Sequence, residues 1–260
     1  MKTITSKDNP TLKAARKLHT RKGREEAGAF LAEGEKLIDE ASAAEFEIEC
    51  IFINANEESL EKLSFSYSAF PLILLEEKLF RELSQTENPQ PCIAVVRRPK
   101  AEKKDAAPER ILILDRIGDP GNAGTMIRTA LAAGMDEAWC VSGTADVFSD
   151  KVIRASAGAV FNLPVKEKLK AADCIKMLRE IGAKLIVCDA EGANIYNEEL
   201  TGRLGIVIGS ESAGSQKVFI ENADAVVGIP MTKASESLNA AVAAGVVMYE
   251  VLRQSKGDAV

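Results

Sequence analysis

The chain has 260 residues, of which 46% are hydrophobic and 28% are charged, and its net charge is −6. This balance supports a sizeable buried core and excludes an intrinsically disordered chain, and the length corresponds to about two domains at ~150 residues each. No apolar segment follows Met1 and Lys2, and the longest weakly polar run, 238–252, is too short to cross a bilayer. We therefore expect a cytoplasmic protein that is neither exported nor membrane-bound.

The cysteines and the histidine exclude two kinds of site. The five cysteines lie mostly in apolar runs and form no CxxC pair, which indicates buried free thiols in a reducing compartment. His19 is the only histidine, which excludes a His-based catalytic triad and most zinc sites. We expect no bound metal.

The charge is unevenly distributed along the chain. Residues 1–24 contain eight basic residues and one acid, a balance of +7, which leaves −13 for the rest of the chain. Such asymmetry favours an N-terminus that faces a polyanion, although a solvated basic helix face explains the charge equally well. The candidate contact residues are Lys13, Arg16, Arg21, Lys22 and Arg24.

Residues 1–98 predict a small α/β domain built from alternating elements. Helices are expected at 11–20, 35–43, 57–63 and 76–83, and strands at 30–32, 50–53, 72–75 and 93–96. The segment 99–109 is rich in Lys, Ala and Pro and has no apolar period, so it predicts a linker.

The second domain is expected over residues 110–260. Continuous apolar runs are typical of strands that are buried on both faces of a parallel sheet, and such runs occur at 111–114, 138–141, 185–187, 205–208 and 225–229. Helical patterns fall between several of them. The pattern therefore predicts a doubly wound α/β domain.

The first strand of this domain is followed by a glycine-rich turn, GDPGNAG (118–124), with Asn122 as the predicted N-cap of a helix over 125–133. The segment lacks both GxGxxG spacing and a Walker GK[ST] ending. It is either an anion site at a helix N-terminus or a plain tight turn. Arg128 lies in an otherwise apolar helix, where an arginine usually has an anionic partner.

A second polar segment follows the run 205–208. Gly209 ends the predicted strand and Glu211 comes two residues later. A glycine and a carboxylate at this place are typical of a ligand crevice at the carboxyl edge of an α/β sheet.

The third polar segment lies near the C-terminus. Pro230 removes a backbone donor and ends a strand, and Ser235 or Ser237 is predicted to cap the helix that follows. A role as helix cap, with tight packing of the helix, fully explains a serine at position 237. It explains an asparagine at position 239 less well, because asparagine is unfavourable inside a helix.

Together these three segments resemble, in order and spacing, the three motifs of the SpoU/TrmH family of RNA 2′-O-ribose methyltransferases, which belongs to the SPOUT superfamily. The segments read DPGNAGTMIRTA (119–130), IGSESAG (208–214) and IPMTKASESLNAAVA (229–243). The resemblance covers about residues 110–253. Residues 1–98 resemble the substrate-binding domain that is often fused to this family and is similar to kink-turn-binding ribosomal proteins.

The resemblance implies a deep trefoil knot at the C-terminal end of the sheet, which is a rare exception to normal chain connections. The knot would form a pocket for S-adenosyl-L-methionine, in which Gly209, Ile229 and Leu238 supply backbone and apolar contacts. The resemblance also implies a homodimer, with the C-terminal helix and the helix of the first motif near the interface.

Candidate catalytic residues carry over by position. Asn122 and Arg128 match the polar pair of the first motif, Glu211 the carboxylate of the second, and Ser237 and Asn239 the third. Because a guanidinium keeps its proton in proteins, we expect Arg128 to clamp a phosphate and stabilise a developing 2′-oxyanion. The other polar side chains would orient the ribose and the loop.

The implied substrate is structured RNA. We favour 23S ribosomal RNA because the N-terminal domain resembles that of rRNA-modifying members, and the basic residues of 1–24 would add salt-dependent RNA affinity. The alternatives are a tRNA methyltransferase, a non-catalytic RNA-binding protein with the same fold, and a nucleotide-dependent oxidoreductase or kinase-like enzyme. Lys233 departs from the usual glycine of the family and is given no role.

Overall fold

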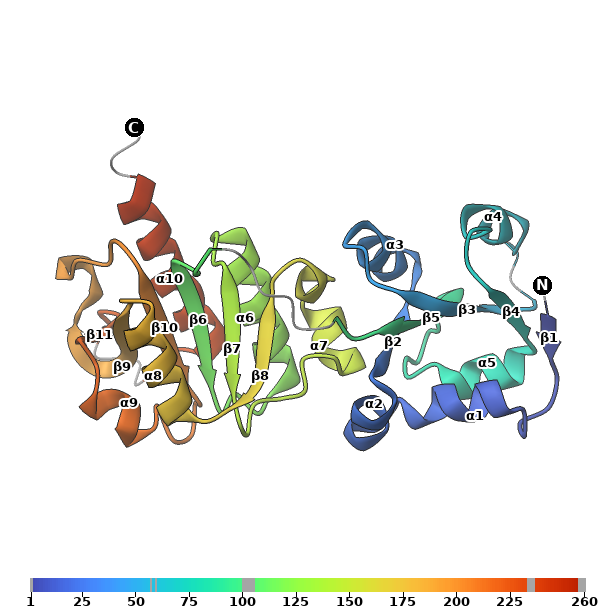
Figure 1. The fold of residues 1–260 in the computed structure, drawn as a ribbon, viewed down its shortest axis with the longest axis horizontal. Coiled ribbons are helices and arrows are strands. Elements are labelled where there is room, and N and C mark those ends of the chain that lie inside the picture. Colours follow the sequence, from blue (N-terminus) through green and yellow to red (C-terminus); the bar gives the residue numbers. More distant parts are fainter. Residues whose placement is uncertain (1, 57, 59, 100–105, 233–236, 257–260) are drawn as a thin grey trace. The chain divides into compact units, whose positions relative to one another are not determined.

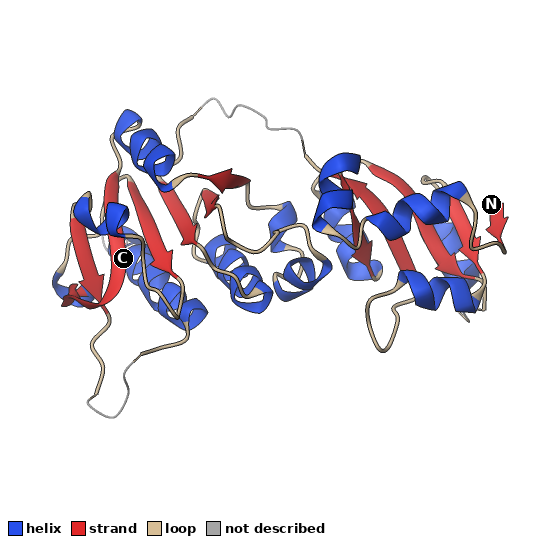
Figure 2. Cartoon of the chain, turned by 90° about the horizontal axis from the view of Figure 1, so that it is seen from below, coloured by secondary structure: helices blue, strands red, loops and turns tan. Residues whose placement is uncertain are grey.

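The protein is described by a computed structural model that covers residues 2–56, 58, 60–99, 106–232 and 237–256 (Figure 1). The chain divides into two compact units. The N-terminal unit comprises residues 1–102 together with 148–154, and the C-terminal unit comprises residues 103–147 and 155–260. In both units strands form one layer that helices cover (Figure 2).

The N-terminal unit contains a mixed five-stranded sheet in the order β1-β4-β3-β5-β2. Strand β4 pairs in parallel with β1 and β3, whereas β5 pairs antiparallel with β3 and β2. The strands are β1 (Lys2–Ile4), β2 (Ala29–Glu33), β3 (Ile48–Asn54), β4 (Leu72–Leu75) and β5 (Cys92–Arg97).

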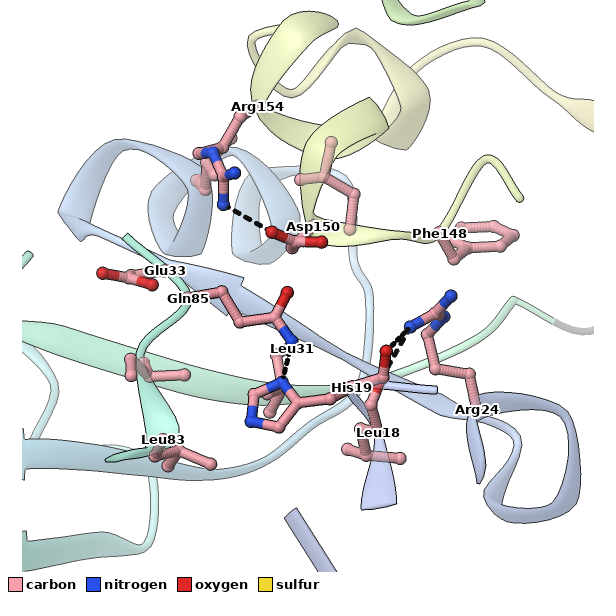
Figure 3. A pocket seen from close by; sticks show the side chains of 13 residues that line it. Leu18, His19, Arg24, Leu31, Glu33, Leu83, Gln85, Phe148, Asp150 and Arg154 are labelled. Carbon is pink, nitrogen blue, oxygen red and sulfur yellow. Dashed lines mark hydrogen bonds and ion pairs between the residues drawn. The ribbon is translucent and has the colours of Figure 1, made fainter. Parts of the chain in front are cut away.

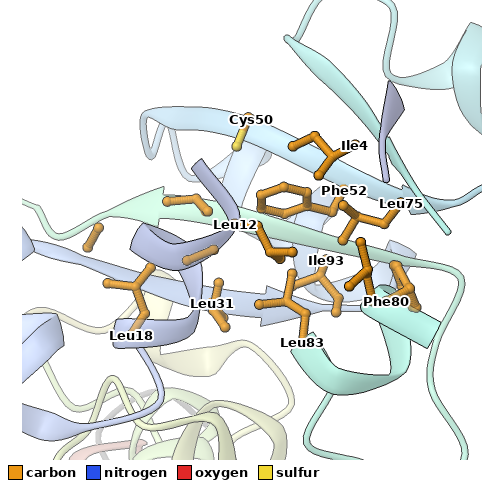
Figure 4. Packing of buried hydrophobic residues seen from close by; sticks show 14 residues of the cluster. Ile4, Leu12, Leu18, Leu31, Cys50, Phe52, Leu75, Phe80, Leu83 and Ile93 are labelled. Carbon is orange, nitrogen blue, oxygen red and sulfur yellow. The ribbon is translucent and has the colours of Figure 1, made fainter. Parts of the chain in front are cut away.

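Helices lie on both faces of this sheet (Figure 1). They are α1 (Pro10–Lys17), α2 (Arg21–Ala27), α3 (Glu35–Ala43), α4 (Leu60–Ser66) and α5 (Glu77–Leu83). Leu12 of α1 and Phe80 of α5 pack against Phe52 and Ile93 of the sheet in one core cluster (Figure 4). Burial of these large apolar side chains stabilises the unit by roughly 1.5–3 kcal/mol for each side chain.

Most predicted elements of this unit are confirmed within a few residues, but the first helix differs. The predicted helix over 11–20 ends at Lys17, and a separate helix starts at Arg21. The Thr20 hydroxyl accepts a hydrogen bond from Gly23 N, so Thr20 is the N-cap of the second helix. Strand β1 was not predicted, because a three-residue strand is too short to show a period.

The C-terminal unit contains a six-stranded sheet in the order β11-β9-β10-β6-β7-β8. All its neighbouring strands pair in parallel, which confirms the predicted parallel-sheet domain. The strands are β6 (Arg110–Asp115), β7 (Glu137–Val141), β8 (Val165–Leu169), β9 (Lys184–Asn194), β10 (Leu204–Gly209) and β11 (Ala225–Gly228).

Helices α8 and α9 pack on one face of this sheet, and α6 and α10 lie together on the other (Figure 1). The remaining short helices follow β7 and β9. The helices of this unit are α6 (Pro120–Ala132), η1 (Ala159–Phe161), α8 (Ala171–Glu180), η2 (Ile195–Asn197), α9 (Lys217–Glu221) and α10 (Ala240–Lys256). Helix α7 (Asp150–Ala155) also follows β7, but all of it except Ala155 belongs to the N-terminal unit. The sheet is therefore covered on both faces, as continuous apolar strands require.

Strand β8 was not predicted, because its sequence, VKEKL, mixes charged and apolar residues. It lies at the edge of the sheet, where it forms backbone hydrogen bonds with only one neighbouring strand, β7. Lysine on an edge strand also discourages pairing with other chains. Edge placement explains why a strand of this composition forms.

The five cysteines are free thiols. Four are buried and Cys188 is half-buried. Burial raises the pKa of the Cys50 thiol to about 11 and that of Cys174 to about 12, which keeps both protonated and unreactive. No helix among the described residues is long and apolar enough to cross a membrane.

Candidate active site

A cavity of about 200 Å³ lies where the pairing of β9 with β10 ends, next to the start of α10. Ligands of parallel α/β sheets bind at this carboxyl edge. The cavity is lined by Cys188, Asp189, Ala190, Ile208, Gly209, Ser210, Glu211, Gly214, Ile229, Met231, Ser237, Leu238, Ala240 and Ala243. All three predicted cofactor contacts, Gly209, Ile229 and Leu238, are among these residues.

Glu211 joins the three sequence motifs. Its Oε1 accepts hydrogen bonds from Asn122 Nδ2 at 3.2 Å, from Asn239 Nδ2 at 2.8 Å and from Ala240 N at 3.1 Å. The Asn239 amide also donates to Asn122 Oδ1 at 2.9 Å. Residues that lie 89 and 117 positions apart in the chain thus form one polar cluster.

Asn239 also starts the last helix. Its Oδ1 accepts from Ala241 N at 3.0 Å and from Val242 N at 3.2 Å, so Asn239 is the N-cap of α10. The prediction that Ser237 caps this helix is wrong, because the helix begins at Ala240. Ser235 lies outside the described residues. Ser237 instead lines the cavity.

Asn122 holds a different position from the predicted one. The helix begins at Pro120, and Asp119 is its N-cap, with Oδ1 accepting from Asn122 N at 2.7 Å. Proline at the first helical position and aspartate before it are both favoured there. Asn122 therefore lies inside the first turn of α6, which leaves its side chain available to Glu211.

The backbone of the second motif is tightly folded at Gly209. A Cβ on Gly209 would lie 2.3 Å from Gly214 C and from Ser215 N, so only glycine allows this close approach. A hydrogen bond from Gly214 N to Ser210 O, at 2.9 Å, closes the turn. The loop 209–215 is compact and presents its backbone to the cavity.

Arg128 is not part of this cluster. Its side chain is exposed on α6, and among the described residues it makes no hydrogen bond or ion pair. The anionic partner expected for Arg128 is not found in the described part of the chain. Arg128 does not line the cavity either.

Two residues of the site region were not singled out from the sequence. Asp115, at the end of β6, is completely buried and binds Gln216, and Asp189 in β9 lines the cavity. The signal for both was a carboxylate directly after an apolar run. Burial raises the pKa of the neighbouring Cys188 thiol to about 11, and the Asp189 charge acts in the same direction.

The basic residues of the N-terminal segment are largely paired. Ion pairs join Lys13 to Asp8, Arg16 to Glu82, Arg21 to Glu25, and Lys22 to Glu26. The side chains of Lys13 and Lys22 remain 55% and 85% exposed. Exposed ion pairs of this kind are weak, so another anion can readily replace the carboxylate.

Arg24 differs from the other candidate RNA contacts because it is buried. Its Nη1 donates to Leu18 O at 2.7 Å and to His19 O at 3.0 Å. These bonds hold the turn between α1 and α2. We therefore assign Arg24 a structural role and leave it out of the proposed RNA surface.

A second, much smaller cavity of about 20 Å³ lies in the N-terminal unit beside His19 (Figure 3). This is room for about one water molecule, so it does not fit a ligand. The Gln85 amide contacts His19 Nδ1 and faces the carboxylate of Asp150. Burial lowers the pKa of His19, against the opposing effect of Asp150 and with the help of Arg24.

Residues 109–249 match the SpoU rRNA Methylase family. The chain belongs to this family. Residues 9–94 match the MRM3-like substrate binding domain, so the predicted SpoU-type enzyme with an N-terminal substrate-binding domain is confirmed. Among the described residues, no group of three or more His, Cys, Asp or Glu side chains is placed to hold a metal ion.

Similar proteins match nearly the whole chain. The 23S rRNA (guanosine(2553)-2′-O)-methyltransferase RlmP of Bacillus subtilis is 33% identical over 252 residues, which are 96% of this chain and 99% of that protein. The AdoMet-bound rRNA methyltransferase of Sinorhizobium meliloti has a TM-score of 0.86 at 28% identity and covers 100% of this chain and 98% of its own.

A third member of the group also contains the cofactor. The SpoU methyltransferase AviRb of Streptomyces viridochromogenes, in complex with AdoMet, has a TM-score of 0.84 at 28% identity. The match covers 95% of this chain and 98% of that one. The similarity therefore extends over both units and not only over the SpoU motifs.

Proposed function

We propose that this protein transfers a methyl group from S-adenosyl-L-methionine to a ribose 2′-hydroxyl in ribosomal RNA, with 23S ribosomal RNA as the favoured substrate. One observation carries the proposal. Glu211 ties Asn122 and Asn239, from the first and third motifs, together at the edge of the cavity. A protein that only binds RNA has no need for such a cluster beside a cavity.

The cavity fits S-adenosyl-L-methionine. Ligand sites of this kind are mostly apolar with a few placed polar groups, and the lining combines Ile208, Ile229, Met231 and Leu238 with backbone from the two strand ends. The described lining residues include two carboxylates, Asp189 and Glu211, and no lysine or arginine. This charge suits a cationic sulfonium. Gly209, Ile229 and Leu238 would hold the cofactor by backbone and apolar contacts.

When bound, S-adenosyl-L-methionine supplies an electrophilic methyl group on sulfur. The residues around it position the acceptor, because the leaving thioether is neutral and needs no acid. Asn122, Ser237 and Asn239 orient the ribose and the loop. Arg128 binds the phosphate next to the target ribose and stabilises charge that develops on the 2′-oxygen.

Residues 1–98 are the proposed RNA-binding domain, 99–109 the linker and 110–260 the methyltransferase domain. RNA affinity comes from a folded surface with the exposed side chains of Lys13, Arg21 and Lys22 and the half-buried side chain of Arg16, whose acidic partners exchange for phosphate. Resemblance of this domain to kink-turn-binding ribosomal proteins supports a structured RNA target. We place the activity in the cytoplasm, where ribosomal RNA is accessible.

Close backbone packing between β9 and β11, whose pairing is irregular at Val226 and Val227, supports a knot in the C-terminal unit. A Cβ on Gly228 would lie 2.9 Å from the carbonyl oxygens of Asp189 and Gly192, and one on Gly192 would lie 2.5 Å from Val227 C. The end of β11 thus presses against the end of β9. An experimental structure in which residues 209–240 do not pass through the loop after β9 would contradict the knot.

A homodimer is the proposed assembly. Apolar side chains are exposed on the two packed helices: Leu131 on α6 at 37%, and Val242 and Tyr249 on α10 at 54% and 51%. Val242 and Tyr249 are seven residues apart and share one helix face. A second copy would cover this face. Sedimentation should give a dimer for the wild type and a monomer for Val242→Glu, and a monomeric wild type would contradict the assembly.

The decisive test of the function is methyl transfer to defined RNA. Purified protein is incubated with labelled S-adenosyl-L-methionine and transcripts of 23S ribosomal RNA or of tRNA, and 2′-O-methyl groups are mapped. Methylation of one ribose in 23S RNA is expected. Methylation of tRNA would instead identify tRNA as the substrate. Cofactor binding without methyl transfer to any RNA would contradict the enzymatic function.

A further inference from the structure

The loop 209–216 is held at two places, and only one of them involves the candidate active site. Glu211 fixes the outer side of the loop to α6 and α10. The other attachment lies beneath the loop at Asp115, which does not line the cavity. This second attachment needs an explanation of its own, because Asp115 cannot touch a ligand of the cavity directly.

Asp115 holds both ends of the loop. Its backbone is opposite Gly209 in the register between β6 and β10, so it pairs where the loop leaves the sheet. Its side chain binds where the loop returns: Oδ2 accepts from Gln216 N at 2.6 Å and Oδ1 accepts from Gln216 Nε2 at 2.7 Å. One residue therefore sets the distance between the two ends.

The Asp115 carboxylate is fully buried, and burial of an unpaired charge is strongly unfavourable. Besides the two bonds from Gln216, Oδ1 accepts from Arg116 Nε at 3.2 Å. Arg116 has a φ of 58°, a left-handed conformation that is unusual for a residue with a side chain, and its Nη2 donates to Gly214 O at 3.3 Å. A strained residue persists where its surroundings determine it. Arg116 thus links the buried carboxylate to the loop a second time.

The base of the loop is closely packed. The backbone of Gly214 and Ser215 lies directly against Gly209, so closely that a Cβ on Gly209 would come within 2.3 Å of both. A change in the position of Gln216 would therefore move Gly209 and Gly214, and both line the cavity.

We propose that Asp115 and Gln216 form a positioning pair that sets the shape of the cofactor pocket without contacting the cofactor. The inference rests on the proposed function, since it takes this cavity as the site of S-adenosyl-L-methionine. The pair selects one loop conformation from those the chain could adopt. It therefore acts on cofactor affinity and not on RNA affinity.

The pair allows a test by exchange of carboxylate and carboxamide. Asp115→Asn removes the charge and sets an amide donor against Arg116 Nε, but the Gln216 amide can turn over and accept from the new amide, so this defect is mild. Gln216→Glu places two carboxylates together in a buried site, which is the severe defect. In the double variant this repulsion is removed. The carboxamide oxygen introduced at position 115 can accept from the backbone N–H of position 216, while the new amide donates to the carboxylate introduced there. The bond from Arg116 Nε is lost, so rescue should be partial.

The control is Asp224→Asn at the opposite, amino-terminal edge of the same sheet. Asp224 Oδ2 also accepts from a backbone amide, Leu185 N at 2.7 Å, and from Arg179 Nη1 at 2.7 Å. This variant loses comparable bonds in the same unit. It reports what a general loss of stability does to cofactor affinity.

Calorimetry with S-adenosyl-L-methionine and initial rates of methyl transfer are measured on the full chain, with thermal melts to verify folding. We expect Gln216→Glu to raise the Kd and the KM for the cofactor at least about tenfold, or about 1.4 kcal/mol, and Asp115→Asn to raise them by a smaller factor, with the KM for RNA changed less than about twofold. The double variant should recover at least half of the loss in Gln216→Glu. Asp224→Asn should leave the Kd within about twofold of wild type.

The experiment distinguishes a failure of the positioning pair from a failure of the proposed function. Wild-type protein that does not bind S-adenosyl-L-methionine would overturn the function and, with it, the pair. Wild-type binding together with unchanged binding by Gln216→Glu would overturn only the positioning pair. Equal losses in Gln216→Glu and in the double variant, or in Asp224→Asn, would reduce Asp115 to a general stabilising residue.

Discussion

Replacement of Glu211 by alanine is the most direct perturbation of the polar cluster. It removes the oxygen that accepts hydrogen bonds from Asn122, Asn239 and Ala240 N, so each of these three donors loses its bond to Glu211. Hydrogen bonds to a charged group contribute about 1.5–3 kcal/mol when shielded from water. Glu211 and Asn239 are exposed, so screening reduces each contribution to about 1 kcal/mol.

The expected total loss is about 3 kcal/mol, which corresponds to a decrease in kcat/KM on the order of 100-fold. Glu211→Gln keeps an uncharged oxygen at the same place and loses only the charge, which contributes roughly half the strength of such bonds. A decrease of about tenfold is expected for Glu211→Gln. The difference between the variants separates the acceptor from the charge.

Initial rates of methyl transfer, measured with RNA and cofactor both below saturation, give kcat/KM directly. Glu221→Ala, an exposed glutamate at the end of α9, is the matched control and should stay within about twofold of wild type. A Glu211→Ala rate within about threefold of wild type would refute the reasoning. Equal losses in Glu211→Ala and Glu211→Gln would show that the charge matters and the hydrogen bonds do not.

Arg128, Asn239 and His19 give three more tests. Arg128→Lys keeps the charge but loses the forked geometry of the guanidinium, so the variant should lose most of the single-turnover rate of methyl transfer. A rate near that of the wild type would exclude the proposed contact of Arg128 with the phosphate. Asn239→Asp keeps the cap of α10 but sets a carboxylate beside Glu211, so it should lose activity while Asn239→Ser retains more, as thermal melts and rates will show. Burial lowers the pKa of His19, so the unfolded chain binds a proton more tightly than the native one, and the N-terminal unit should lose stability as the pH falls below about 6.5. Denaturation at about pH 7.5 and about pH 5.5 should show this dependence, and an equal dependence in His19→Gln would exclude His19 as its source.

Local patterns in the sequence predicted most of the fold. Continuous apolar runs identified β6, β7, β9, β10 and β11, because strands buried on both faces carry no polar alternation. The edge strand β8 was missed, since an exposed charged strand has no such signal. Helix starts were misplaced by a few residues for a different reason: Asp119 and Asn239 each cap a helix, but several nearby residues could have done so.

The candidate site was predictable only in part. The spacing of three motifs placed Asn122, Glu211 and Asn239 in one site, and the structure joins them by hydrogen bonds. The buried bonds of Asp115 to Gln216, 101 residues later, leave no mark in a local pattern. Likewise, Arg24 resembles a basic surface residue until its two carbonyl partners are known.

The sequence distances across the cluster have a consequence for synthesis of the chain. Asn122 is synthesised 117 residues before its partner Asn239, so α6 can form long before the cluster does. A ribosome shields the most recently made residues of a nascent chain, so the cluster closes only after Asn239 has left the exit tunnel. A chain that stops before residue 237 should therefore fold its N-terminal unit yet fail to bind the methyl donor.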